Sequence, residues 1–156
     1  MASSNVKIKK VLLAMDGSEC SFRASKYAIG LAKVVGSEIT LVHVLDNIRQ
    51  GGAIGLQARY GNIRPLRGFF KTSENAARKW TKRVEREAKN KGVKLSTKII
   101  LDQSSKAEEI LKYADKSNAD LIILGTRGFG RLKRLIIGSV ANAVLGNTKC
   151  PVLVVK

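Results

Sequence analysis

The chain has 156 residues, of which 44% are hydrophobic and 26% are charged, and its formal net charge at pH 7 is +17. The length suits a single domain over residues 1–156, and the composition is typical of a water-soluble globular protein. The apolar runs are shorter than the roughly 20 residues that cross a bilayer, and the first residues lack a secretory pattern, so we expect a cytoplasmic protein without a membrane segment. The positive charge favours anionic partners in general.

Cysteine and histidine are rare in this chain. Cys20 and Cys150 are too few for a disulfide framework, and a single histidine, His43, excludes a site built from several histidines. We expect both cysteines to pack as small hydrophobic side chains and His43 to lie in the core or at a strand end. We predict no metal bound by protein ligands alone.

The first half of the chain alternates strand and helix patterns. Residues 10–15 form an apolar run that ends at the turn sequence Asp16-Gly17-Ser18. Apolar and small residues then recur at three- and four-residue spacing as far as Val35, which predicts a helix ended by Gly36. Residues 38–45 are rich in apolar and β-branched residues that do not alternate with polar ones, as in a strand covered on both faces.

The second half continues the alternation after an irregular stretch. Residues 46–70 are rich in glycine and arginine without a clear period, so we expect a long, flexible loop there. A helix around residues 76–88, a strand at 94–101, a helix opened by Ser104 or Ser105, and a strand at 121–124 follow. A last helix at 139–145 and a strand at 150–155 close the chain.

Strands that alternate with helices form a parallel sheet with helices on both faces. Such open sheets bind ligands beyond the carboxyl ends of their strands, where the winding reverses. The loops after the first and fourth strands are the two candidates, and we expect them to meet at that edge.

The most informative motif is the segment Gly125-Thr126-Arg127-Gly128, which nine residues separate from Gly138-Ser139. Backbone without a Cβ can approach a phosphate closely, and a hydroxyl beside a helix N-terminus adds a donor where negative charge is favoured. Glycines that only serve a tight turn would explain one or two of these positions. Four basic residues within this region either neutralise phosphate or face solvent: Arg127, Arg131, Lys133 and Arg134.

Two further features allow two readings each. Asp16 follows the first strand, where it either forms its own turn or accepts from ribose hydroxyls. The basic helix around residues 76–88 either presents a solvated face or binds nucleic acid. We recognise no catalytic triad or carboxylate pair, although positioning alone would allow slow ATP hydrolysis.

Several segments together resemble the universal stress protein family. They are VLLAMDGSE at residues 11–19, ITLVHV at 39–44, DLIILGTRG at 120–128, GSV at 138–140 and CPVLVV at 150–155. The pattern G-x2-G-x9-G-(S/T) is matched in full, as in the family members that bind ATP. The resemblance implies a Rossmann-like α/β fold with five parallel strands in the order 3-2-1-4-5.

The resemblance also implies ligand contacts and a partner. Asp16 would contact the adenosine, the backbone of Val44 would meet adenine, and the phosphates, with or without Mg²⁺, would be held by Gly125, Gly128, Gly138, Ser139 and Val140. Family members commonly form homodimers through the last strand, here residues 152–156. An apolar strand with unpaired edge groups makes such pairing physically favourable. The resemblance therefore implies an ATP-binding, nucleotide-responsive stress-response dimer.

Overall fold

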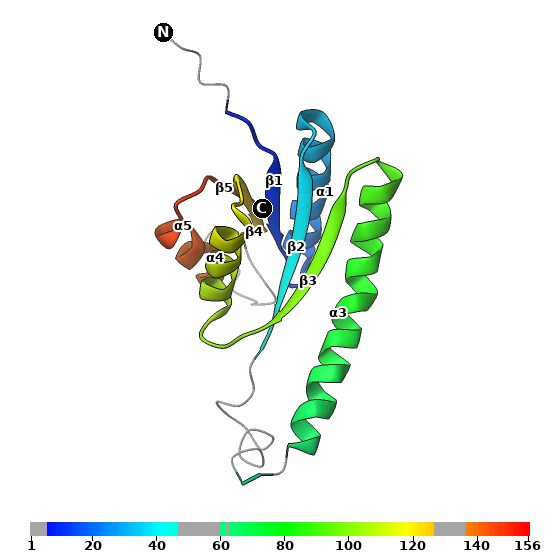
Figure 1. The fold of residues 1–156 in the computed structure, drawn as a ribbon, viewed down its shortest axis with the longest axis vertical. Coiled ribbons are helices and arrows are strands. Elements are labelled where there is room, and N and C mark those ends of the chain that lie inside the picture. The colour runs from blue at the N-terminus through cyan, green and yellow to red at the C-terminus, as the bar shows by residue number, and fades with distance from the viewer. Residues whose placement is uncertain (1–5, 47–59, 62, 127–136) are drawn as a thin grey trace.

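Five parallel strands form one sheet in the order β3-β2-β1-β4-β5, which confirms the expected topology. The computed structural model describes residues 6–46, 60–61, 63–126 and 137–156. The strands are β1 (Lys10–Ala14), β2 (Glu38–Leu45), β3 (Leu95–Leu101), β4 (Leu121–Gly125) and β5 (Val152–Val155). The described helices are α1 (Glu19–Val35), α3 (Arg64–Asn90), α4 (Lys106–Ser117) and α5 (Ser139–Asn147), and Figure 1 shows their arrangement.

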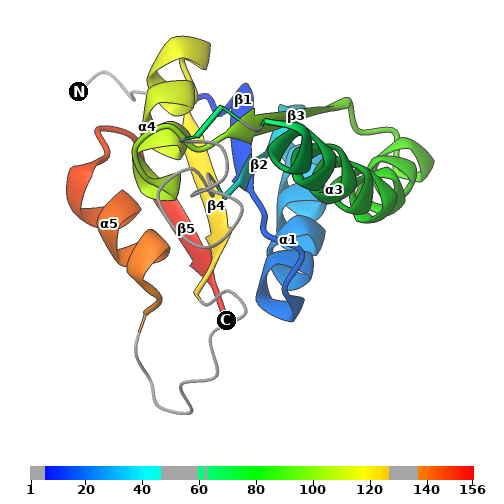
Figure 2. The ribbon, with the colours of Figure 1, turned by 90° about the horizontal axis from the view of Figure 1, so that it is seen from below.

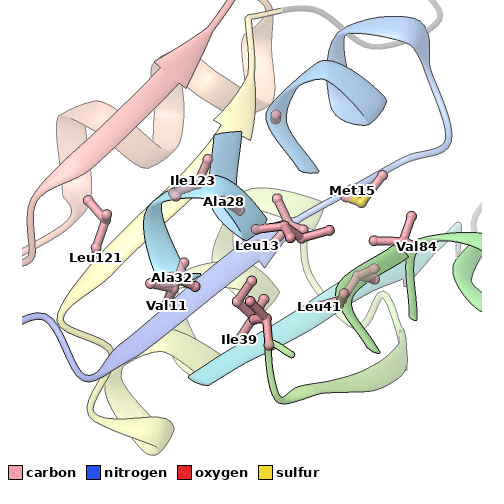
Figure 3. Packing of buried hydrophobic residues seen from close by; sticks show 14 of the residues in the cluster. Val11, Leu13, Met15, Ala28, Ala32, Ile39, Leu41, Val84, Leu121 and Ile123 are labelled. Atoms are coloured by element: carbon pink, nitrogen blue, oxygen red, sulfur yellow. The ribbon is translucent and has the colours of Figure 1, made fainter. Parts of the chain in front are cut away.

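The helices cover both faces of the sheet, with α1 and α3 on one side and α4 and α5 on the other (Figure 2). Side chains alternate along each strand, so Leu13 and Ile123 join the cluster under α1 and α3, whereas Leu12 and Ile122 join the cluster under α4 and α5. Figure 3 shows the first cluster, in which Leu13 lies among side chains from the neighbouring strands and helices. Burial on both faces explains why these strands are apolar throughout.

Local signals fix the ends of the helices. Ser18 caps α1 by accepting a hydrogen bond from the Ser21 amide, and Gly36 ends the helix with a left-handed φ of 73°. Of the two serines expected to open α4, Ser105 is the cap and accepts from the Glu108 amide. Polar side chains therefore mark the starts of α1 and α4, and a glycine marks the end of α1.

The expected loop at residues 46–70 is wrong for its last seven residues, because α3 begins at Arg64. Pro65 and Gly68 favour a loop when they are considered alone. Proline is nevertheless well tolerated in the first turn of a helix, where its missing N–H would have no partner. Leu66 is buried, so packing stabilises this turn in spite of Gly68. Residues 47–59 and 62 lie outside the described part.

The cysteines follow the expectation, with Cys20 buried and Cys150 half-buried. Within the described ranges, none of the helices combines the length and the apolar run that crossing a membrane requires.

Gly125 is required by packing between β4 and α1. A Cβ built on Gly125 would lie 2.8 Å from the carbonyl carbon of Cys20 and 2.9 Å from its Cβ, which is closer than real atoms approach. The first turn of α1 therefore sits directly against the end of β4. This contact explains the first glycine of the motif without any ligand.

We predict that Gly125→Ala lowers the free energy of unfolding by about 1–3 kcal/mol, because the added methyl group overpacks a backbone contact. Gly30→Ala is the matched control: Gly30 lies on the exposed side of α1, and a Cβ there meets nothing within 4 Å. The control should gain roughly 0.5–1 kcal/mol, the usual helical advantage of alanine. Urea unfolding of both variants measures the difference, and equal stabilities would contradict the close contact.

Candidate functional site

A cavity of about 840 Å³ opens at the carboxyl ends of the strands, the edge onto which Figure 2 looks. Its volume suits a ligand of nucleotide size. The loops after β1 and β4 both border it, as expected. Its lining includes Met15, Asp16, His43, Val44, Asp46, Phe69, Ser73, Trp80, Lys106, Gly125, Thr126, Gly138, Ser139, Val140 and Ala141.

Asp16 lies in the cavity wall and also forms its own turn. One carboxylate oxygen accepts a hydrogen bond from the Ser18 amide at 3.0 Å, which fixes the loop between β1 and α1. A carboxylate has a second oxygen with further acceptor capacity. The two readings of Asp16 are therefore compatible, because the turn holds the side chain at the cavity.

The backbone of Val44 faces the cavity because β1 ends before β2 does. In a parallel sheet, alternate residues bond to opposite neighbours. Leu45 bonds toward β3, through its carbonyl and the Asp102 amide, whereas the Val42 carbonyl bonds to the Met15 amide on the β1 side. The backbone groups of Val44 point to the same side of β2 as those of Val42. However, β1 ends at Ala14, which lies opposite Val42. The N–H and C=O of Val44 thus point into the space beyond β1.

The N-terminus of α5 supplies amide donors at the other side of the cavity. Gly138 is the N-cap, and its own N–H donates to the Thr126 carbonyl at 2.7 Å. The next three amides, of Ser139, Val140 and Ala141, have no carbonyl one turn earlier in the helix. All three residues line the cavity. Negative charge is favoured there by both the amides and the helix dipole.

Thr126 adds an unsatisfied hydroxyl that the sequence analysis did not identify. Its Oγ1 is buried and has no hydrogen-bond partner among the described residues, while its N–H donates to the Val155 carbonyl at 2.7 Å. Buried hydroxyls without partners are costly, so such a group at a cavity indicates a missing polar partner. The sequence signal that could have identified Thr126 is its position between Gly125 and Gly128 in the glycine motif.

Four of the predicted contacts on the phosphate side are described and line the cavity: Gly125, Gly138, Ser139 and Val140. The fifth, Gly128, lies outside the described residues, as do the four basic side chains between residues 127 and 134.

Aromatic side chains form one wall of the cavity. Trp80 of α3 packs edge-on against His43, with ring centroids 5.1 Å apart, and against Phe22 at 6.0 Å. A Cβ on Gly17 would lie 3.2 Å from the Trp80 Nε1, so the indole also covers the loop after β1. Because α3 begins earlier than expected, Phe69 also reaches the cavity.

An ion pair lies at the cavity between the end of β2 and the start of α4. The Lys106 ammonium is 2.7 Å from an Asp46 carboxylate oxygen, and both side chains are partly exposed. Lys106 is the one lysine or arginine in the described part of the lining. Among the described residues, no group of three or more histidine, cysteine or acidic side chains is arranged to hold a metal ion.

His43 is held in one tautomer. Its Nδ1 lies 2.9 Å from the Met15 carbonyl oxygen, and a carbonyl can only accept, so Nδ1 carries the proton. Burial lowers the pKa of His43 below its ordinary value of 6.5, although the bond to Met15 opposes the shift. The ring is therefore neutral near pH 7, and it occupies the strand-end position expected for it.

We predict that acidification from pH 7.5 to 5.5 destabilises the protein through His43. The pKa is lower in the folded than in the unfolded chain, so the unfolded chain binds the proton more readily. The stabilising contribution is complete above 6.5 and is lost as pH falls toward the folded value. Chemical denaturation at several pH values across this range measures how the free energy of unfolding changes with pH.

His43→Asn is the control for this titration, because its amide can still donate to the Met15 carbonyl but does not titrate. In this variant the free energy of unfolding should depend less steeply on pH. Because His43 is the chain's single histidine, NMR titration of its ring assigns the pKa directly. A ring pKa at or above 6.5 in the folded protein would contradict the effect of burial.

Comparison with known proteins identifies the family. The model of the universal stress protein family matches residues 7–156. A universal stress protein of Methanocaldococcus jannaschii is 37% identical over 148 residues, which cover 95% of this chain and 82% of the relative. The structure of a universal stress protein from Lactobacillus plantarum aligns with a TM-score of 0.81 at 21% identity, over 97% of this chain and all of that one.

Two more distant structures of the same fold contain nucleotides. A universal stress protein in complex with cAMP aligns with a TM-score of 0.62 at 20% identity, over 96% of this chain and 97% of that one. A universal stress protein from Archaeoglobus fulgidus in complex with dAMP aligns with a TM-score of 0.62 at 18% identity, over 97% and 99%. The family match over nearly the whole chain is decisive, and this chain belongs to the universal stress protein family.

Proposed function

We propose that this chain binds ATP, with or without Mg²⁺, in the cavity at the carboxyl edge of the sheet, and acts as a nucleotide-responsive dimer in the stress response. The observation that carries the proposal is a set of polar groups around one cavity that have no hydrogen-bond partner among the described residues. These are the three first amides of α5 and the buried Oγ1 of Thr126 on one side, and the backbone of Val44 on the other.

Each part of an adenine nucleotide finds a matching group. Adenine carries a donor at N6 beside ring acceptors, which complements the C=O and N–H of Val44. The second oxygen of Asp16 is an acceptor for ribose hydroxyls. The N-terminus of α5 favours phosphate, with Ser139 adding a hydroxyl. The complexes of relatives with cAMP and dAMP support an adenine nucleotide as the ligand.

A magnesium ion fits this arrangement only as a companion of the phosphates. Mg²⁺ in nucleotide sites typically takes phosphate oxygens, water and one or two carboxylates. Asp16 and Asp46 are the carboxylates in the described part of the lining, and Asp46 is already paired with Lys106. We therefore assign phosphate binding primarily to the backbone amides of α5.

We predict that Ser139→Asp weakens ATP binding at least tenfold without loss of stability. The new carboxylate would stand beside the phosphates, where like charges repel, yet acidic residues in the first turn stabilise a helix. Adenosine, which lacks phosphates, should bind both proteins with similar affinity. Trp80 is the chain's single tryptophan and lines the cavity, so its fluorescence reports binding, with calorimetry as a second readout.

Asn90→Asp is the matched control for this experiment. It adds the same charge at the end of α3 that leads into β3, at the opposite edge of the sheet, and should bind ATP as the wild type does. An absence of saturable ATP binding by the wild-type protein would refute the proposed function. Equal ATP affinity of Ser139→Asp and wild type would refute the placement of the phosphates.

We also propose that β5 forms the dimer interface. β5 pairs with β4 on one side only, and Leu153 on this edge strand is 37% exposed. Leu153→Lys should convert a dimer into a monomer of 17.0 kDa, because pairing would bury the new charge. Light scattering coupled to gel filtration measures the mass. Leu145→Lys, at a 40% exposed leucine of α5, is the control that should remain dimeric.

A further inference from the structure

The outer face of α3 carries a row of basic side chains, which we call the α3 basic stripe. Six of its residues recur at spacings of three, four or seven, which places them along one side of the helix. The stripe comprises Arg64, Arg67, Lys71, Arg78, Lys82 and Lys89, with Lys79 and Arg86 beside them. All eight are exposed. From Arg64 to Lys89 the stripe extends about 38 Å at 1.5 Å per residue.

Most of this charge is not neutralised within the described part of the chain. Arg78 pairs with Glu74 at 2.6 Å, whereas the other seven stripe residues make no ion pair with a described residue. The two other acidic residues of α3 are engaged elsewhere: Glu85 accepts from the Thr97 hydroxyl, and Glu87 lies 3.8 Å from Lys91. The stripe therefore presents a net positive field to solvent, although Glu85 keeps its negative charge beside it.

The opposite side of α3 is already occupied. Val84 and Ala88 are no more than 1% exposed and belong to the core cluster with residues of the sheet and α1, while Phe69, Ala77 and Trp80 line the cavity. Figures 1 and 2 show α3 as an outer element of the molecule. A helix that binds a membrane surface inserts its apolar side into the lipid. Here that side is buried, which leaves only charge for an external partner.

We propose that the α3 basic stripe binds the phosphate backbone of double-stranded nucleic acid without reading its sequence. A straight, rigid row of cations matches a polymer with a fixed charge spacing, and its length exceeds the roughly 12 Å width of a major groove, so phosphates on both sides are within reach. The stripe contains no aromatic side chain on which an unpaired base would stack. Phosphate contacts alone confer no base preference.

The test uses the full-length protein and a labelled 20-base-pair DNA duplex of arbitrary sequence, with fluorescence anisotropy measured between 50 and 200 mM salt. The triple variant Lys71→Gln/Lys82→Gln/Lys89→Gln removes three stripe charges with good helix formers. Its plot of log affinity against log salt should be less steep by about 0.9 per lost contact, up to about 2.7 in total. Affinity at 100 mM salt should fall at least tenfold.

The control variant is Lys7→Gln/Lys116→Gln/Lys149→Gln, which removes the same charge from exposed lysines outside α3 and outside the proposed dimer strand. Its plot of log affinity against log salt should have the wild-type slope to within one unit. Both variants should bind ATP as the wild type does, which separates this inference from the proposed nucleotide site.

Three results would overturn the inference. They are no binding of the duplex at 50 mM salt, an equal loss of affinity in the two triple variants, and mutually exclusive binding of ATP and the duplex, which would place the duplex in the cavity. A second duplex of unrelated sequence and an RNA duplex of the same length should bind within a few-fold of the first, and a strong sequence preference would contradict a backbone-only contact. Vesicles rich in phosphatidylserine that outcompete the duplex at equal charge would assign the stripe to membranes instead.

Discussion

Strand β1 ends opposite Val42, three residues before β2 ends, and the candidate site depends on this difference in length. Had β1 continued, its next backbone groups would bond to Val44 and close the space between the two strands. The turn at Asp16 and Gly17 prevents this by leading the chain into α1. The same turn packs against Trp80. One turn therefore leaves the backbone groups of Val44 without a β1 partner and also supports the aromatic wall of the cavity.

The glycine motif combines two physical roles that its pattern alone does not separate. Gly125 has no room for a Cβ because the first turn of α1 packs against it, which is a requirement of folding. Gly138 has φ −60° and ψ 156°, a conformation open to other residues, and its amide is already bonded to Thr126. The amides that remain for an anion belong to the residues after it. The glycines shape the loop, and the start of α5 provides the donors.

Much of the fold was predictable because its signals are local. Apolar runs gave the strands, and Ser18, Gly36 and Ser105 set helix ends through short-range hydrogen bonds and backbone preferences. The order of strands came from family resemblance. The start of α3 was missed because the burial of Leu66, a tertiary effect, outweighs the weak helix propensity of Gly68.

Sequence motifs predict some of the residues that line the candidate site. They do not predict the residues that only tertiary packing brings to the cavity. Asp16, Val44 and Ser139 lie in recognisable segments and line the cavity. Trp80 and Lys106 come from helices whose sequences carry no ligand signal, and only the fold places them there. The hydroxyl of Thr126 stands out only when it is known to be buried and to have no partner among the described residues.

Helix α3 borders both features for which we propose binding, because its two sides face different parts of the molecule. Its inner side contributes Trp80 to the cavity, and its outer side carries the basic stripe. A nucleotide that contacts the indole and shifts this helix would change the position of the stripe relative to the sheet. Thermodynamic reciprocity then requires that a duplex on the stripe change nucleotide affinity by the same factor. Coupling between nucleotide occupancy and a polyanionic partner would then require no second domain. The inner side of α3 borders the cavity, and its outer side carries the basic stripe.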